Sequence, residues 1–156
     1  MENIQEKAHF LKEEFTQGLA ELDADTPRKW GKMNLQQMIE HMAEYVSIAS
    51  GKSSVRNVTP EATLPRMQAF LASEKPFPEN TPNVLLPDEP APVKHATKEE
   101  AIAELQTEID NFLAVYEQNE GRITPNPFFG DLDFEQQVQL LHKHATHHLR
   151  QFGVEV

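Results

Sequence analysis

Four of the seven histidines of this 156-residue chain lie in one short stretch. Residues 141–153 read LHKHATHHLRQFG and contain His142, His144, His147 and His148. Neutral imidazole is the commonest metal ligand that proteins supply near neutral pH. Because side chains four residues apart lie one turn apart on the same face of a helix, His144 and His148 can point at one ion if this stretch is helical.

A helical projection separates these histidines by direction. With His144 at zero and 100° per residue, His148 falls at about 40° and His147 at about −60°, which is further toward solvent. His142 falls near 160° and points away from the pair. The projection therefore favours His144 and His148 as ligands. They lie on the shoulder of an apolar face that comprises Val138, Leu141, Ala145, Leu149 and Phe152.

A third candidate ligand, His41, stands beside the apolar stripe of an earlier predicted helix. If the two helices are neighbours, His41 can face His144 and His148. Three imidazoles that leave one position open are typical of a catalytic divalent-metal site. Two plainer interpretations stay open at this point. A histidine beside an apolar face is often a satisfied core residue, and a histidine cluster on an exposed helix can be polar surface alone.

Four further side chains are candidates to orient the ligands, to bind substrate or to act as a general base. Gln37 lies one turn before His41, and Glu44 lies one turn after it. Gln151 lies one turn after His148, and His147 precedes His148 directly. The alternative for these polar residues is that they belong to solvated helix faces.

Four amphipathic helices are predicted to position these residues. Apolar residues recur at spacings of three and four over residues 3–22, 34–49, 97–118 and 133–152. Asn34, Thr97 and Asp133 are suitable N-caps, and Gly51 and Gly153 are suitable stops. No alternating pattern predicts a strand. The sequence therefore predicts an all-α fold, an up-down four-helix bundle in a single domain over residues 1–156.

A long proline-rich connection is predicted between the second and third of these helices. Eight of the eleven prolines lie between Pro60 and Pro92. Residues 61–73 can hold a short helix, but residues 74–96 are expected to be irregular, because proline removes a backbone donor and blocks helix continuation. We expect this segment to cover the outside of the bundle or to close one end.

Composition argues against several classes of protein. The formal net charge of −11, without a cluster of Lys and Arg, argues against nucleic-acid binding. No apolar run is long enough to cross a membrane, and no signal peptide is recognisable, so we expect a cytoplasmic protein with no membrane partner. The absence of cysteine means that any metal must be held by nitrogen and oxygen ligands.

Two motifs resemble those of a known family. Residues 27–42, PRKWGKMNLQQMIEHM, resemble the opening motif W-G-x-M…Q-M-x-x-H of one branch of the DinB-like superfamily of metalloenzymes. Residues 127–130, PFFG, and 143–153, KHATHHLRQFG, resemble its closing motif P-x-F-G…K-H-x-x-H-H-L-R-Q-F-G. The resemblance covers most of the chain. It implies an up-down four-helix bundle and a divalent ion, most often zinc or nickel, on His41, His144 and His148.

One departure from the family pattern is Asn126, which precedes the second motif where many relatives are expected to carry histidine. If that position contributes to the site, its chemistry here differs. The branch carries no assigned activity, whereas members elsewhere in the superfamily resemble thiol-dependent transferases, isomerases or hydrolases. The superfamily name refers to DNA-damage induction and does not imply DNA binding.

Two hypotheses of function follow. The first is a metalloenzyme that acts on a small molecule as a transferase or hydrolase, with a thiol or water nucleophile generated near pH 7. The second is a non-catalytic helical-bundle module that binds a small molecule or forms a homodimer, with a structural metal or none. A histidine cluster that senses pH without a metal is a third interpretation. An open fourth coordination position would favour the enzyme over a structural site.

Overall fold

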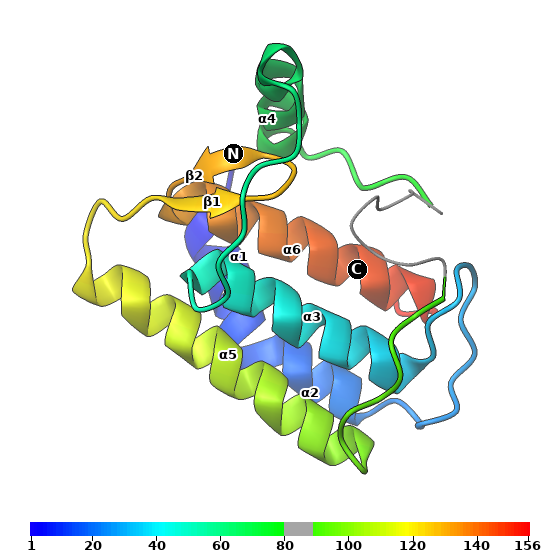
Figure 1. The fold of residues 1–156 in the computed structure, drawn as a ribbon. Coiled ribbons are helices and arrows are strands. Elements are labelled where there is room, and N and C mark those ends of the chain that lie inside the picture. The colour runs from blue at the N-terminus through cyan, green and yellow to red at the C-terminus, as the bar shows by residue number, and fades with distance from the viewer. Residues whose placement is uncertain (80–88) are drawn as a thin grey trace.

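The protein is mostly helical in the computed structural model, which describes residues 1–79 and 89–156 (Figure 1). A π-helical turn over Phe10–Glu14 joins the first two helices, and a 3-10 turn over Glu61–Thr63 precedes the fourth. None of the helices in the described ranges is long and apolar enough to cross a membrane. The helices are α1 (Ile4–His9), α2 (Phe15–Ala20), α3 (Leu35–Ser50), α4 (Leu64–Ala72), α5 (Lys98–Gln118) and α6 (Phe134–Gln151).

The two helices that carry the histidines begin at the predicted caps. At the start of α3, the Asn34 side chain accepts from the Gln37 backbone N–H and the Gln37 side chain accepts from the Asn34 N–H, each at 2.8 Å. Asp133 and Gln136 form the same reciprocal pair at the start of α6. These bonds satisfy backbone donors that the first helical turn leaves free. The capping residues therefore determine where each helix begins, and the spacing from that start determines the direction in which its histidines point.

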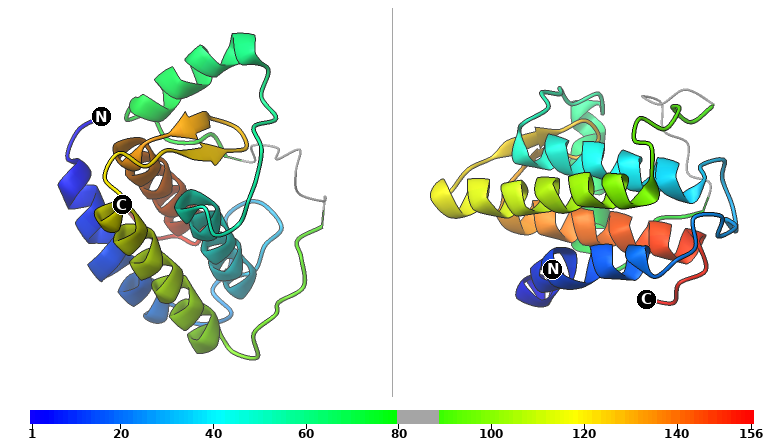
Figure 2. Two further views of the ribbon diagram at one scale, coloured as in Figure 1. Left: turned by 60° about the vertical axis from the view of Figure 1, so that its left-hand side comes forward. Right: turned by 90° about the horizontal axis from the view of Figure 1, so that it is seen from below.

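Four helical segments lie side by side (Figures 1 and 2). The first consists of α1 and α2 together, and the other three are α3, α5 and α6. α3 and α5 run in the same direction. The segment before α5 meets the start of α3, where Gln37 Nε2 donates to the Ala91 carbonyl at 3.0 Å. At the other end, the Tyr116 hydroxyl of α5 donates to the Ala49 carbonyl of α3 at 3.1 Å. This differs from the strict up-down alternation that the sequence predicts, because the residues that lead into α5 lie at the start of α3 and not at its end.

Two apolar clusters hold the elements together. The main core fills the space between the four helical segments and includes Phe15, Met42 and Phe112. A second cluster of Leu71, Phe129, Leu132 and Leu140 lies between α4, α6 and the residues just before α6. Because α6 contributes to both clusters, most of its circumference is covered, and even its polar Gln137, Gln139 and Lys143 are buried.

Two details of the predicted elements need correction. The sequence predicts no strands, but β1 (Thr124–Asn126) pairs antiparallel with β2 (Gly130–Leu132), with Thr124 opposite Leu132. Strands of three residues are too short to show a recognisable alternation, and a sheet this small remains compatible with an all-α fold. The helix predicted over 3–22 spans Ile4 to Ala20 and contains the π-helical turn.

The proline-rich connection is irregular where it is described beyond α4. Helix α4 lies within the short helix predicted over 61–73, and residues 74–79 and 89–96 contain no helix or strand. The middle of the predicted loop, residues 80–88, lies outside the described residues. The later part is tied to α3, because Glu40 accepts from the backbone N–H groups of Lys94 and His95 at 2.7 and 3.1 Å.

Candidate metal centre

Three histidine rings from two helices converge at one point. His41 comes from α3, and His144 and His148 come from successive turns of α6. The His144 Nε2 atom lies 3.1 Å from the Nε2 of His41 and 2.9 Å from the Nε2 of His148. Among the described residues these three form a set whose ligand atoms all lie within 4.8 Å of one another, so they could hold a metal ion.

Hydrogen bonding alone does not account for this convergence. His148 Nδ1 lies 2.7 Å from Gln151 Oε1, which can only accept, so the ring proton is on Nδ1 and the Nε2 of His148 carries a lone pair. In a neutral ring each nitrogen makes one in-plane hydrogen bond, either as donor or as acceptor. His144 Nε2 therefore cannot satisfy both His41 and His148. A cation shared by three lone pairs would satisfy all of them.

Gln151 is itself held by the chain that precedes α3. Its Nε2 donates to the Trp30 carbonyl at 2.9 Å, which leaves Oε1 for His148. The Gln151 carbonyl accepts from the Lys29 N–H at 2.7 Å. Gly31 adopts a left-handed φ of +80°, and a Cβ there would lie 2.7 Å from Gln151 Nε2. The tight approach of this loop thus determines the orientation of the amide, and the amide determines the tautomer of His148.

Burial keeps the three rings neutral. It lowers the pKa of His41 to about 4, with a smaller effect from the nearby His147. It lowers the pKa of His148 to about 3, with His41 adding to the shift and the bond to Gln151 opposing it. The pKa of His144 is also well below its usual value, chiefly through burial and then through the charges that His148 and His41 would carry. At neutral pH all three therefore offer lone pairs, which is the state that metal binding requires.

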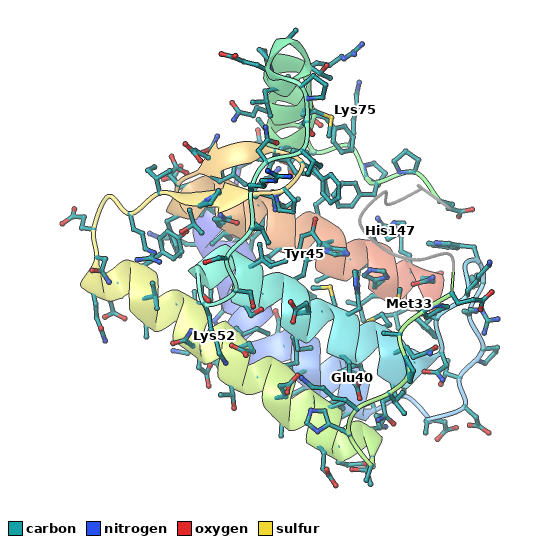
Figure 3. All side chains as sticks on the ribbon, in the orientation of Figure 1. Met33, Glu40, Tyr45, Lys52, Lys75 and His147 are labelled. Atoms are coloured by element: carbon teal, nitrogen blue, oxygen red, sulfur yellow. The ribbon has the colours of Figure 1, made fainter. Side chains whose placement is uncertain are left out.

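The structure also places Tyr45 and Asn126 near the site. The Tyr45 ring lies 4.3 Å from the His144 ring, between α3 and α6 (Figure 3). Burial raises the pKa of the Tyr45 phenol to about 12, while hydrogen bonding with the Asn126 side chain opposes the shift. The Asn126 Oδ1 also accepts from the Phe128 and Phe129 N–H groups. Asn126, at the position where the resemblance predicts histidine in many relatives, thus reaches His144 through Tyr45.

Tyr45 is not among the site residues that the sequence predicts. Its position one turn after His41 was the available signal. Trp30 stands in the first family motif, but that motif does not indicate that the Trp30 carbonyl holds Gln151 from 121 residues away. Only the packing of the loop before α3 against the end of α6 reveals that contact.

The other polar residues that the sequence suggests for the site, and His142, lie outside the converging set. The hydrogen bonds of Gln37 go to Asn34 and to the Ala91 carbonyl, and Glu44 is exposed. His147 is half-buried, with its ring 5.4 Å from that of Trp30 and 5.9 Å from that of Phe77. The His142 ring, which the projection directs away from the pair, instead contacts the Phe10 ring at 5.4 Å.

The donor set and geometry fit a divalent ion. Ligand nitrogens about 2.0–2.1 Å from a tetrahedral zinc are roughly 3.3 Å apart, close to the 2.9 and 3.1 Å separations here. No side-chain Asp, Glu or further His among the described residues joins the three. The arrangement could therefore bind an ion through three neutral imidazoles and leave coordination positions for other ligands.

Comparison with known proteins supports the resemblance seen in the sequence. A family model described as the DinB superfamily matches residues 11–152. Searches among curated proteins and solved structures give no match. The matched region includes all three converging histidines and Gln151. The chain belongs to the DinB superfamily.

Proposed function

We propose that His41, His144 and His148 bind one divalent ion, zinc or nickel, and that the protein is a metal-dependent enzyme acting on a small molecule. The observation that carries the proposal is the convergence of three Nε2 atoms, two of which lie 3.1 and 2.9 Å from the third, in a set of which His144 and His148 are buried and His41 is half-buried. Membership of the DinB superfamily supports it. We also propose that the four helical segments form a single four-helix-bundle domain that frames this site.

The reaction class that fits best is transfer or hydrolysis with a thiol or water nucleophile. When bound, the ion would lower the pKa of a thiol or water that it holds, so that a nucleophile is available near pH 7. Gln151 would keep His148 in the tautomer that presents Nε2. Tyr45 would pack against the His144 ring and restrict its rotation. Burial of the three rings would keep protons from competing with the ion.

The alternative is a non-catalytic module in which the ion is structural or absent. A small-molecule ligand or a second copy of the chain would then be the partner. Three protein ligands favour the enzyme, because structural zinc sites usually have four. The alternative predicts a closed coordination sphere. X-ray absorption spectroscopy of the zinc-loaded protein can distinguish the two, since an open site contains an exchangeable oxygen or sulfur ligand.

The test is metal binding by protein purified without a histidine tag. We expect one equivalent of zinc or nickel by elemental analysis after reconstitution and gel filtration. His41→Ala and His148→Ala should abolish stoichiometric binding, and His142→Ala should retain it. Stoichiometric binding by the His41→Ala variant would contradict the proposal. A screen of thiol cosubstrates with the loaded wild-type protein then tests the reaction class.

A further inference from the structure

A pocket of about 530 Å³ lies beside the histidine cluster. It is bounded by the loop before α3, by residues 76–79 and by the end of α6 with the residues that follow it. His147 is part of its wall, and the His147 ring lies 5.2 Å from the His148 ring. The pocket is therefore separated from the converging Nε2 atoms by little more than one imidazole ring.

The apolar lining of the pocket comprises two aromatic rings together with Pro76, Pro78, Val154 and Val156. The ring of Trp30 lies 5.4 Å from the His147 ring on one side, and the ring of Phe77 lies 5.9 Å from it on another. Flat rings on the walls suit a ligand with a planar or apolar body.

The polar part of the pocket contains two cations. Arg150 is half-buried, and Lys29 is exposed with its side chain next to Gly153. Neither forms an ion pair or a side-chain hydrogen bond within the part of the chain that the structure describes. The carboxylates in the pocket, Glu79 and Glu155, are both exposed. The most sheltered charge in the pocket is thus a guanidinium, which matches an oxyanion in a bidentate manner.

We propose that this pocket binds a small molecule that has an oxyanion, either a carboxylate or a phosphate, on an apolar body, with the oxyanion on Arg150 and Lys29 and the body between Trp30 and Phe77. The inference deepens the proposed function and rests on it for the reaction, because His147, which lines the pocket, has its ring 5.2 Å from the ring of the proposed ligand His148. Binding itself does not depend on the ion. The two cations would then select the substrate or cosubstrate, and His147 would form the wall between pocket and metal.

The single tryptophan of the chain makes the test direct. Because Trp30 lines the pocket, its fluorescence should change when a ligand binds. Metal-free protein in phosphate-free buffer is titrated with phenyl phosphate, with phenylacetate and with phenol. We expect saturable binding of one or both anions and much weaker binding of phenol. The tighter of the two anions identifies the oxyanion as phosphate or carboxylate.

Substitutions assign the contacts. Arg150→Gln should raise the Kd of the preferred anion about tenfold or more, since a hydrogen bond to a charged group is lost. Lys29→Gln should raise it by a smaller factor, because that side chain is exposed. The matched control Arg66→Gln alters an exposed arginine of α4 and should leave the Kd unchanged. Circular dichroism of each variant checks that it is folded.

Failure of the pocket and failure of the metal site are distinguishable. Absence of saturable binding, equal binding of phenol, or an unchanged Kd in both Arg150→Gln and Lys29→Gln would overturn the pocket proposal. So would anion binding that requires zinc, is lost in His41→Ala and is unaffected by Arg150→Gln, because the anion would then sit on the ion. Anion binding that depends on Arg150 in a protein that takes up no zinc would support the pocket and contradict the metal function.

Discussion

At the scale of single residues, the site depends on a chain of contacts that runs outward from the histidines. His148 is oriented by Gln151, and Gln151 is oriented by the Trp30 carbonyl. His144 is flanked by Tyr45, whose phenol meets Asn126. The rings of His148 and His144 therefore each have a neighbour that restricts their tautomer or their rotation. Mutation of partners of this kind typically lowers metal affinity or activity roughly 10- to 100-fold.

Replacement of Gln151 tests the role of this contact. Gln151→Leu should lower the affinity for zinc roughly 10- to 100-fold, because nothing then fixes the proton of His148 on Nδ1. Gln151→Glu restores the acceptor for His148 but removes the donor to the Trp30 carbonyl, so it should recover only part of that loss. Competition titrations with a chromophoric chelator give both affinities. Equal zinc affinity of Gln151→Leu and wild type would mean that the amide has no part in positioning the ligand.

The lowered histidine pKa values predict how the stability of the metal-free protein depends on pH. The pKa values of His41 and His148 in the folded protein, about 4 and about 3, lie below the ordinary value of 6.5. At a pH between the folded and ordinary values, the unfolded chain therefore binds more protons than the folded protein does. Stability should therefore be full above about pH 6.5 and fall as the pH decreases toward 4, by up to about 1.4 kcal/mol per pH unit for each ring.

Urea denaturation with a chelator at pH 7, 6 and 5 measures this effect. His148→Gln should show a shallower loss of stability than wild type over the same range, because one titrating ring is gone. The pKa of His142 is also lowered by burial, so the comparison of variant with wild type isolates the contribution of His148. Stability that is constant from pH 7 to pH 5 would contradict the buried, neutral state of the cluster.

At the scale of the elements, two helices present the ligands and irregular segments are tied to them. The segment before α5 binds α3 through Gln36, Gln37 and Glu40. The segment after α4 binds α6, where buried Lys143 donates to the Ser73 carbonyl at 2.8 Å and to the Lys75 carbonyl. These contacts draw the described parts of the proline-rich connection toward the end of the bundle that holds the histidines.

Glu40 makes a testable contribution to this attachment. Burial alone would raise the pKa of its carboxyl, but the hydrogen bonds from Lys94, Gln36 and His95 outweigh it and lower the pKa. Glu40→Ala should therefore speed amide exchange at Lys94 and His95 by about two- to tenfold, the equivalent of a lost hydrogen bond. Glu44→Ala, an exposed change on the same helix, serves as the control. Unchanged exchange in Glu40→Ala would show that other contacts hold this segment.

At the scale of the whole molecule, the candidate metal site brings together helices that are far apart in the sequence. The His41 and His144 nitrogens lie 103 residues apart in sequence, so an ion there would link the second and last of the four helical segments. The net charge of −11 keeps the chain repelled from phosphate polymers, and the absence of a nucleic-acid partner stays a prediction. A homodimer and a cytoplasmic location also stay predictions.

Zinc should therefore stabilise the entire fold. At a free zinc concentration of 100 times the Kd, binding to the folded state alone adds about 2.7 kcal/mol to the free energy of unfolding. For a chain of this size the corresponding rise in Tm is roughly 5–10 °C. Differential scanning calorimetry with and without zinc measures the shift. His41→Ala should show almost none, while His142→Ala should respond as wild type does.

The sequence alone is enough to predict the features that depend on neighbouring residues. The caps at Asn34 and Asp133 and the apolar spacing determine where α3 and α6 begin, and the spacing of four places His144 and His148 on one face. These features depend on neighbours within about one helical turn, so they can be read without a fold. The net charge and the lack of cysteine limit the partners and the ligand types in the same direct way.

The tertiary structure alone decided which distant residues meet. It brings His41 to the α6 pair, places Tyr45 against His144, and connects Gln151 to the loop at Trp30. It also gives α5 the same direction as α3, and it forms a hairpin too short to leave a pattern in the sequence. Such contacts arise because the apolar surfaces of several helices are buried together. The arrangement with the lowest free energy depends on how all the segments pack against one another, so no single segment of the sequence reveals it.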